Sequence, residues 1–179
     1  MLKKKLARIL SEISNGFLTM ILTPVIPILF SLLDSEKKIL LSLIYILLPL
    51  VPFFIFKKLG MISDYEFTKR EERPPYFITV SILMGIAYLF VRTLGIEILT
   101  SVSLNIFLVS TALTIVTFLW KMSGHMTYST ALFCTLIYIF PSTPLPYLLF
   151  LFSPFIGWSR IELDKHTLTQ VTVGTLVTL

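Results

Sequence analysis

ILTSVSLNIFLVSTALTIVTFLW, residues 98–120, contains no Asp, Glu, Lys or Arg. A helix needs about 20 residues to cross the hydrocarbon core of a bilayer, and this stretch is long enough. The stretches Ile13–Leu33 and Ile39–Phe56 are also uncharged. Of the 179 residues, 55% are hydrophobic and 14% are charged, which gives more apolar surface than one water-soluble core of this size buries. We therefore expect the excess apolar surface to face lipid.

Further helices are expected where apolar runs are separated by charged or proline-rich segments. Pro74–Val91 is slightly short for a span, and Pro141, Pro144 and Pro146 interrupt the uncharged stretch Met122–Ser159. These prolines predict a turn between two short helices. We expect helices at residues 11–33, 38–56, 75–94, 97–119, 124–140, 145–158 and from about 166 to the chain end. The predicted fold is all-α: a polytopic transmembrane bundle of about six helices, within a range of five to seven, in a single integral membrane domain over residues 1–179.

The basic residues are unevenly distributed among the predicted loops. If the helices cross in alternation, all of the 15 Lys and Arg residues except Lys37, Lys38 and Arg92 lie on one side. The positive-inside rule then predicts that this side is cytoplasmic. A phosphate-binding site would also gather basic residues, but the excess persists when the residues that could form such a site are left out. We therefore expect a multi-pass protein whose basic loops face the cytoplasm.

The chain has two histidines, in the motifs Ser123-Gly124-His125 and Ser159-Arg160-x5-His166, and both are predicted on the basic side. Imidazole supplies a nucleophile or a proton donor near neutral pH, and ionisable groups at the ends of membrane helices are candidates for function. The alternative is that each histidine anchors a helix end among lipid headgroups. Two histidines, each beside Ser and a small or cationic residue, favour a functional site.

Several neighbouring residues are suited to an anion. Ser123 and Gly124 at a helix start would offer backbone N–H groups, a hydroxyl and the positive end of the helix dipole, although Ser-Gly also commonly begins helices. Arg73 and Arg160 have planar guanidinium groups that fit phosphate oxygens. Lys69 would share a face with Arg73 if the intervening stretch were helical. The alternative for residues 69–73 is a solvated charged turn.

Arg73-Pro74, Ser123-Gly124-His125 and Ser159-Arg160-x5-His166, in this order in a polytopic protein, resemble the three signature motifs of the type 2 phosphatidic acid phosphatase family. The resemblance covers residues 69–170 and implies a phosphatase-like core at about residues 57–179. It implies metal-independent hydrolysis through a phosphohistidine intermediate. On this basis His166 would be the nucleophile and His125 the acid that protonates the leaving oxygen. The implied phosphate-binding residues are Lys69, Arg73, Ser123, Gly124 and Arg160.

Three positions depart from the family pattern. Glu66 stands where a lysine is usual, so that Lys69 or Arg70 would have to supply a second cation, and Met122 stands where a proline is usual. Gln170 replaces the carboxylate expected four residues after the nucleophilic histidine. On a helix this spacing would put Gln170 on the face of His166, where its amide oxygen could accept the Nδ1 proton. Asp164 and Glu162 are nearby carboxylates that could compensate.

The sequence therefore predicts a hydrolase of lipid-linked phosphates or pyrophosphates, such as phosphatidic acid, phosphatidylglycerol phosphate or a polyprenyl pyrophosphate. We expect the bilayer and the lipid substrate as partners, no nucleic acid and no metal or other cofactor; the oligomeric state is left open. One alternative is a catalytically weakened relative that binds or translocates lipid phosphates. Another is a structural membrane subunit with fortuitous motifs.

Overall fold

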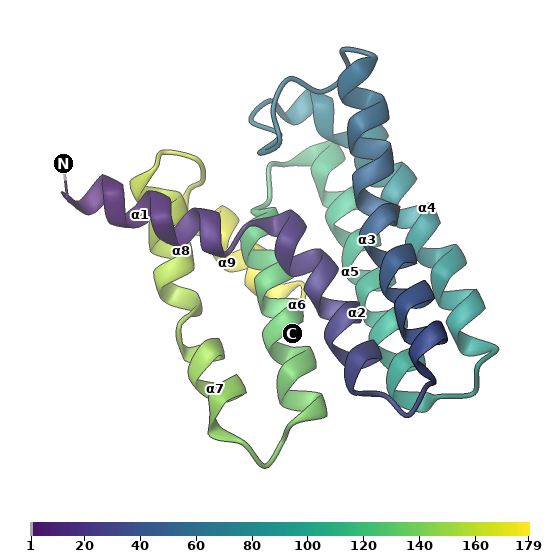
Figure 1. The fold of residues 1–179 in the computed structure, drawn as a ribbon. Helices are drawn as coiled ribbons and strands as arrows, with labels where there is room; N and C mark the ends of the chain where they lie inside the picture. The colour runs from purple at the N-terminus through teal and green to yellow at the C-terminus, as the bar shows by residue number, and fades with distance from the viewer. Residues whose placement is uncertain (1) are drawn as a thin grey trace. The chain divides into compact units, whose positions relative to one another are not determined.

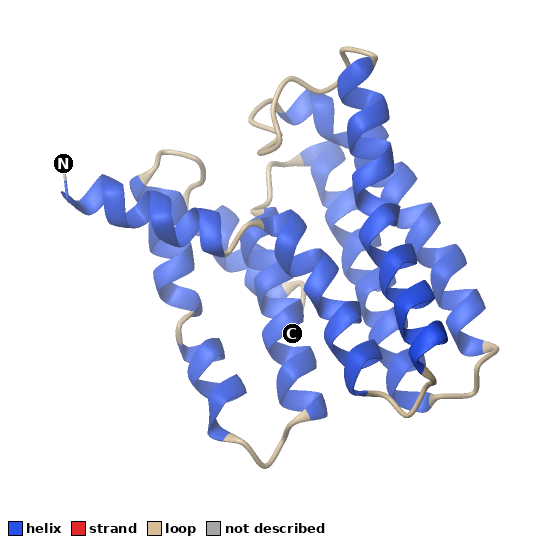
Figure 2. Ribbon diagram, in the orientation of Figure 1, coloured by secondary structure: helices blue, strands red, loops and turns tan. Residues whose placement is uncertain are grey.

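The structure is a computed structural model and describes residues 2–179. All regular secondary structure in this range is helical, which confirms the predicted all-α fold (Figures 1 and 2). The elements are α1 (Leu2–Ile13), α2 (Gly16–Phe30), α3 (Ser35–Lys58), the short 3-10 helix η1 (Arg70–Glu72), α4 (Arg73–Arg92), α5 (Glu97–Leu119), α6 (Gly124–Ile139), α7 (Pro144–Leu151), α8 (Ser153–Glu162) and α9 (Leu168–Leu176).

Four helical stretches among the described residues are long and apolar enough to cross a membrane. They are Leu2–Phe30, Ser35–Lys58, Arg70–Arg92 and Glu97–Leu119. The last three agree with the predicted spans to within a few residues. The chain therefore has the helices that a multi-spanning membrane protein requires.

The first predicted span, residues 11–33, is divided between two helices. The break falls at Ser14 and Asn15, where the side chain of Asn15 accepts a hydrogen bond of 2.9 Å from the backbone N–H of Phe17. The Ser14 hydroxyl donates to the carbonyl of Leu10 at 2.7 Å. These side chains cap the end of α1 and the start of α2, so the polar pair ends one helix and begins the next.

The predicted helix at residues 145–158 is also divided, into α7 and α8. Pro154 lies in the first turn of α8, where its missing N–H costs no helical hydrogen bond. The hydroxyl of Ser153 donates to the carbonyl of Phe150 at 2.6 Å, which satisfies an acceptor at the end of α7. The predicted turn before α7 is present, because α6 ends at Ile139 and α7 begins at Pro144.

The chain divides into two compact units. Unit 1 contains the residues up to Thr23 together with Lys121–Leu179, and unit 2 contains Pro24–Trp120. The division falls within α2. Unit 1 therefore combines segments from the two ends of the sequence, whereas unit 2 is continuous.

Unit 2 is built from α3, η1, α4, α5 and the second half of α2. Helices α4 and α5 run side by side and are joined by a short loop (Figure 1). Hydroxyl groups link the helices: those of Ser81 and Thr111 are 2.7 Å apart, and that of Tyr76 donates to the carbonyl of Pro49 at 3.2 Å. Hydrogen bonds between helices of this kind are typical of membrane bundles. The fully buried side chains between them include Val80, Met84, Ile106 and Leu113.

Unit 1 is built around α6, which contacts α7, α8 and α9, while α1 packs across α8 (Figure 1). Two glycines allow close helix contacts. A Cβ atom on Gly174 of α9 would lie 2.9 Å from the carbonyl oxygen of Ser123, and one on Gly157 of α8 would lie 2.6 Å from Cγ1 of Val171. Because real Cβ atoms do not approach so closely, a side chain at residue 174 would displace α9 from the backbone of α6, and one at residue 157 would require the side chain of Val171 to shift.

Candidate functional site

His166 contacts Gln170 at the start of α9. The Nδ1 atom of His166 is 3.0 Å from the Oε1 atom of Gln170, and the His166 side chain is buried. The sequence predicted this contact from two positions on one helix face. In the structure His166 precedes the helix instead: Thr167 is the N-cap, and Gln170 closes a capping box with it. The contact is therefore made by the N-terminal cap of α9.

The hydrogen bonds of Gln170 fix which nitrogen of His166 carries the proton. The backbone N–H of Thr167 can only donate, so the Gln170 atom 3.2 Å from it is the amide oxygen. The same oxygen faces Nδ1 of His166 and can only accept. Nδ1 therefore carries a proton, and in neutral imidazole the lone pair lies on Nε2. This is the tautomer that a nucleophilic Nε2 requires.

The motif Ser123-Gly124-His125 begins α6 beside the start of α9. Ser123 is fully buried and is the N-cap of α6, where its hydroxyl accepts a long hydrogen bond of 3.5 Å from the N–H of Met126. The backbone N–H of Ser123 donates to the carbonyl of Gln170 at 3.3 Å. His125 lies in the first turn of α6 and is 8% exposed. The structure thus brings Ser123 into direct contact with Gln170, four residues after His166.

Arg160 lies in the last turn of α8 and is 2% exposed. Its backbone carbonyl accepts hydrogen bonds from the N–H groups of Lys165 and His166, at 3.0 and 3.2 Å. This turn is closed by Asp164 in the left-handed region, at φ 55°. The loop between α8 and α9 therefore folds back on Arg160 and holds the backbone of His166 next to it. Asp164 itself is exposed and forms an ion pair of 3.6 Å with Lys4.

Ser11 of α1 contacts Arg160 and was not predicted from the sequence. The Nη1 atom of Arg160 donates a hydrogen bond to the Ser11 hydroxyl, and both side chains are buried. Ser11 and Ala7 are one helical turn apart and form the face of α1 that packs on α8. The other residues of α1 have long side chains, so this pair of small residues indicates that another helix packs closely here. The pair does not identify which helix that is.

Lys69 and Arg73 belong to unit 2 and differ in environment. They do not share one helix face, because η1 and not an α-helix follows Lys69. Lys69 is exposed and forms an ion pair of 3.2 Å with Glu72. Arg73 is buried, and its Nε atom donates to the carbonyl of Phe67 at 3.0 Å. Phe67 has a positive φ of 51°, so Arg73 also stabilises a constrained turn.

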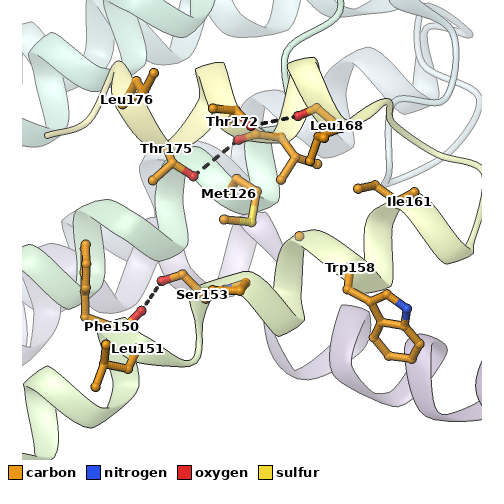
Figure 3. Close-up of a pocket in the computed structure, with 13 residues that line it drawn as sticks. Met126, Phe150, Leu151, Ser153, Trp158, Ile161, Leu168, Thr172, Thr175 and Leu176 are labelled. Atoms are coloured by element: carbon orange, nitrogen blue, oxygen red, sulfur yellow. Dashed lines mark hydrogen bonds between the residues drawn. The ribbon is translucent and has the colours of Figure 1, made fainter.

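A pocket of about 520 Å³ lies among α6, α7, α8 and α9 in unit 1 (Figure 3). Met126 and Ile161, which line it, directly follow His125 and Arg160 in the sequence. Successive residues of a helix point about 100° apart, so the pocket lies to one side of these site residues. The other lining residues include Phe150, Leu151, Trp158, Leu168, Val171 and Leu176.

The hydroxyl groups that line this pocket form hydrogen bonds with backbone carbonyl groups. Those of Ser153, Thr172 and Thr175 each donate to a nearby carbonyl, as Figure 3 shows. The lining therefore has an apolar character, and its volume falls in the range of about 300 to 1,000 Å³ that is typical of ligand pockets.

Among the described residues, no group of three or more His, Cys, Asp or Glu is placed to hold a metal ion. No family model, no curated protein and no solved structure matches this chain. Any functional assignment therefore depends on the motif residues and on the geometry of the site.

Proposed function

We propose that this protein is a membrane-embedded phosphatase that hydrolyses a lipid-linked phosphate or pyrophosphate without a metal, as the resemblance to the type 2 phosphatidic acid phosphatases implies. The main support is the contact between His166 and Gln170, because it leaves the imidazole lone pair on Nε2. Arg160 and the start of α6 lie next to these residues through direct backbone contacts. A nucleophile and groups suited to binding phosphate are thus held by one unit of the protein.

In the proposed reaction, Nε2 of His166 forms a bond to phosphorus while the bond from phosphorus to the leaving oxygen breaks. Protonated His125 gives its proton to that oxygen. Arg160 and the donors of Ser123 and Gly124 stabilise the charge on the other phosphate oxygens. Neutral His125 then takes a proton from water, and the resulting hydroxide equivalent displaces phosphate from His166. Both histidines return to their starting states.

A lipid substrate is favoured over a soluble phosphate by the apolar pocket beside the site. Its volume and lining suit a hydrocarbon chain whose phosphate is held by the neighbouring Arg160. The resemblance also assigns phosphate binding to Lys69 and Arg73, and for these residues the role is a prediction from the motifs alone. From the positive-inside rule we propose that the site faces the cytoplasm.

A second function, binding or translocation of a lipid phosphate without hydrolysis, is favoured by the identity of residue 170. The amide of Gln170 orients His166 but carries no charge, so it stabilises an imidazolium less than a carboxylate does. Both functions require the same binding residues, so a binding measurement does not distinguish them. A measurement of turnover does.

The direct test is phosphate release by purified protein in detergent with EDTA, using a panel of lipid phosphates. We expect release by the wild type, and we expect His166→Ala to abolish release while it still binds lipid phosphate. His125→Ala should impair natural lipid substrates more than an activated aryl phosphate, whose leaving group needs little protonation. Turnover in the folded His166→Ala variant would exclude His166 as the nucleophile, and binding without turnover in the wild type would favour the second function.

A further inference from the structure

The exposed face of α1 carries an aliphatic stripe. Leu2, Leu6, Ile9 and Ile13 are 81%, 51%, 48% and 68% exposed. Their spacing of four, three and four residues aligns them along one side of the helix. Four large aliphatic side chains in a continuous row form an apolar patch, whereas a single exposed leucine does not, and such patches mark surfaces that bind a membrane or another protein.

Basic residues surround this stripe. Lys3 and Lys5 flank it on its two sides, and Lys4 and Arg8 lie further round the helix. All four are exposed, and Glu12 is the only acidic residue of α1. Long basic side chains at the border of an apolar stripe can bury their methylene groups while their charges reach polar headgroups.

The remaining face of α1 fixes the helix to unit 1. Ala7 and Ser11 are buried against α8, and Lys4 forms its ion pair with Asp164 after that helix. The end of α1 at Ile13 allows the helix to take a direction different from that of α2 (Figure 1). The aliphatic stripe therefore lies on the exposed side of α1, and the opposite side of the helix packs against α8.

We propose that α1 is an interfacial helix that binds the surface of an anionic bilayer. Its stripe enters the outer acyl region, and Lys3 and Lys5 contact lipid phosphate groups. A purely aliphatic stripe with basic borders is complementary to a lipid surface of negative charge. A protein partner would be the alternative occupant of the stripe. This inference does not depend on the proposed phosphatase activity.

The test places an environment-sensitive fluorophore on a single cysteine in a Cys134→Ser background. Ile9→Cys labels the stripe, and Arg8→Cys labels the adjacent polar side of the same helix. The full-length protein is reconstituted into vesicles of phosphatidylcholine, with or without phosphatidylglycerol. We expect the probe at residue 9 to be quenched by lipid-borne quenchers and shielded from iodide, and the probe at residue 8 to show the reverse.

Charge reversal tests the preference for anionic lipid. Each basic residue near an anionic surface strengthens binding by about fivefold. Lys3→Glu with Lys5→Glu should therefore expose the probe at residue 9 in vesicles that contain phosphatidylglycerol. The matched control, Lys57→Glu with Lys58→Glu at the end of α3, should leave that probe shielded.

Three outcomes would overturn the proposal. The first is equal access of iodide to the probes at residues 8 and 9 in both kinds of vesicle. The second is shielding at residue 9 that disappears when the protein is diluted in lipid, which would identify a second protein copy as the occupant. The third is shielding that responds neither to phosphatidylglycerol nor to the reversal of Lys3 and Lys5.

Discussion

Substitution of Gln170 by Leu tests how His166 is oriented. It removes the oxygen that contacts Nδ1 of His166 at 3.0 Å and the N–H of Thr167 at 3.2 Å. A hydrogen bond between neutral groups contributes about 0.5 to 1.5 kcal/mol. If the contact with His166 is needed in the transition state, its loss lowers turnover by roughly two- to thirteenfold. The lost contact with Thr167 should destabilise α9 by a similar free energy.

The assay compares turnover at saturating lipid phosphate with thermal unfolding of the same preparations. Thr167→Ala is the matched control, because it removes the hydroxyl that accepts the N–H of Gln170 at 3.3 Å but leaves the amide on His166. We expect this control to lose stability without losing turnover. A Gln170→Leu variant with wild-type turnover would refute the proposed orientation of His166.

Carboxylates at position 170 extend the same test. Gln170→Glu keeps the side-chain length and adds a charge that stabilises the cationic phosphoimidazole, so turnover should equal or exceed that of the wild type. Gln170→Asp adds the same charge on a shorter side chain, and its effect depends on whether the carboxylate still reaches Nδ1. Hydrolysis that appears only in a carboxylate variant would support lipid phosphate binding as the wild-type function.

Three further predictions concern packing, positioning and sidedness. Gly174→Ala should destabilise the protein by about 1 to 3 kcal/mol in thermal unfolding, because its Cβ would lie 2.9 Å from a backbone oxygen of α6; Gly16→Ala, whose nearest contact is 3.5 Å, should be nearly neutral. Ser11→Ala removes the hydroxyl that accepts a hydrogen bond from the buried guanidinium of Arg160, and it should lower kcat/KM by roughly one to two orders of magnitude. Ser11→Thr keeps a hydroxyl and is the control. Equal losses of kcat/KM in the two variants would refute the role of Ser11 in positioning Arg160. Lys58→Cys in a Cys134→Ser background should resist an impermeant thiol reagent in intact cells, and ready labelling would reverse the proposed topology.

The sequence predicted the helices best where a single physical requirement decides them. Uncharged runs such as residues 98–120 must satisfy their backbone within a helix, and α5 follows this prediction closely. The prediction was less accurate where polar side chains compete locally. Asn15 divides the first span by capping α2, and Pro154 begins α8 within an expected helix. Such breaks depend on single side chains, so the mean hydropathy of a long apolar stretch does not reveal them.

For the candidate site in unit 1, the sequence predicted which residues are in contact more accurately than it predicted the geometry of those contacts. The contact between His166 and Gln170 was expected from their spacing, but the spacing did not reveal that a helix cap would make it. The contact of Ser11 with Arg160 was not predictable, because the two residues are 149 positions apart. A local pattern encodes a helix face, whereas the partner of that face is determined by the tertiary fold.

The assembly of unit 1 from both ends of the chain has a consequence for biogenesis. Ser11 and Arg160 are separated by 149 residues, which at about 5 to 20 residues per second takes the ribosome roughly 7 to 30 s to synthesise. Unit 2 is continuous in sequence and can form during this interval, but α1 must wait for α8. A bilayer surface that holds α1 meanwhile would keep its aliphatic stripe from aggregating and would leave the face with Ser11 available to α8 once that helix is synthesised.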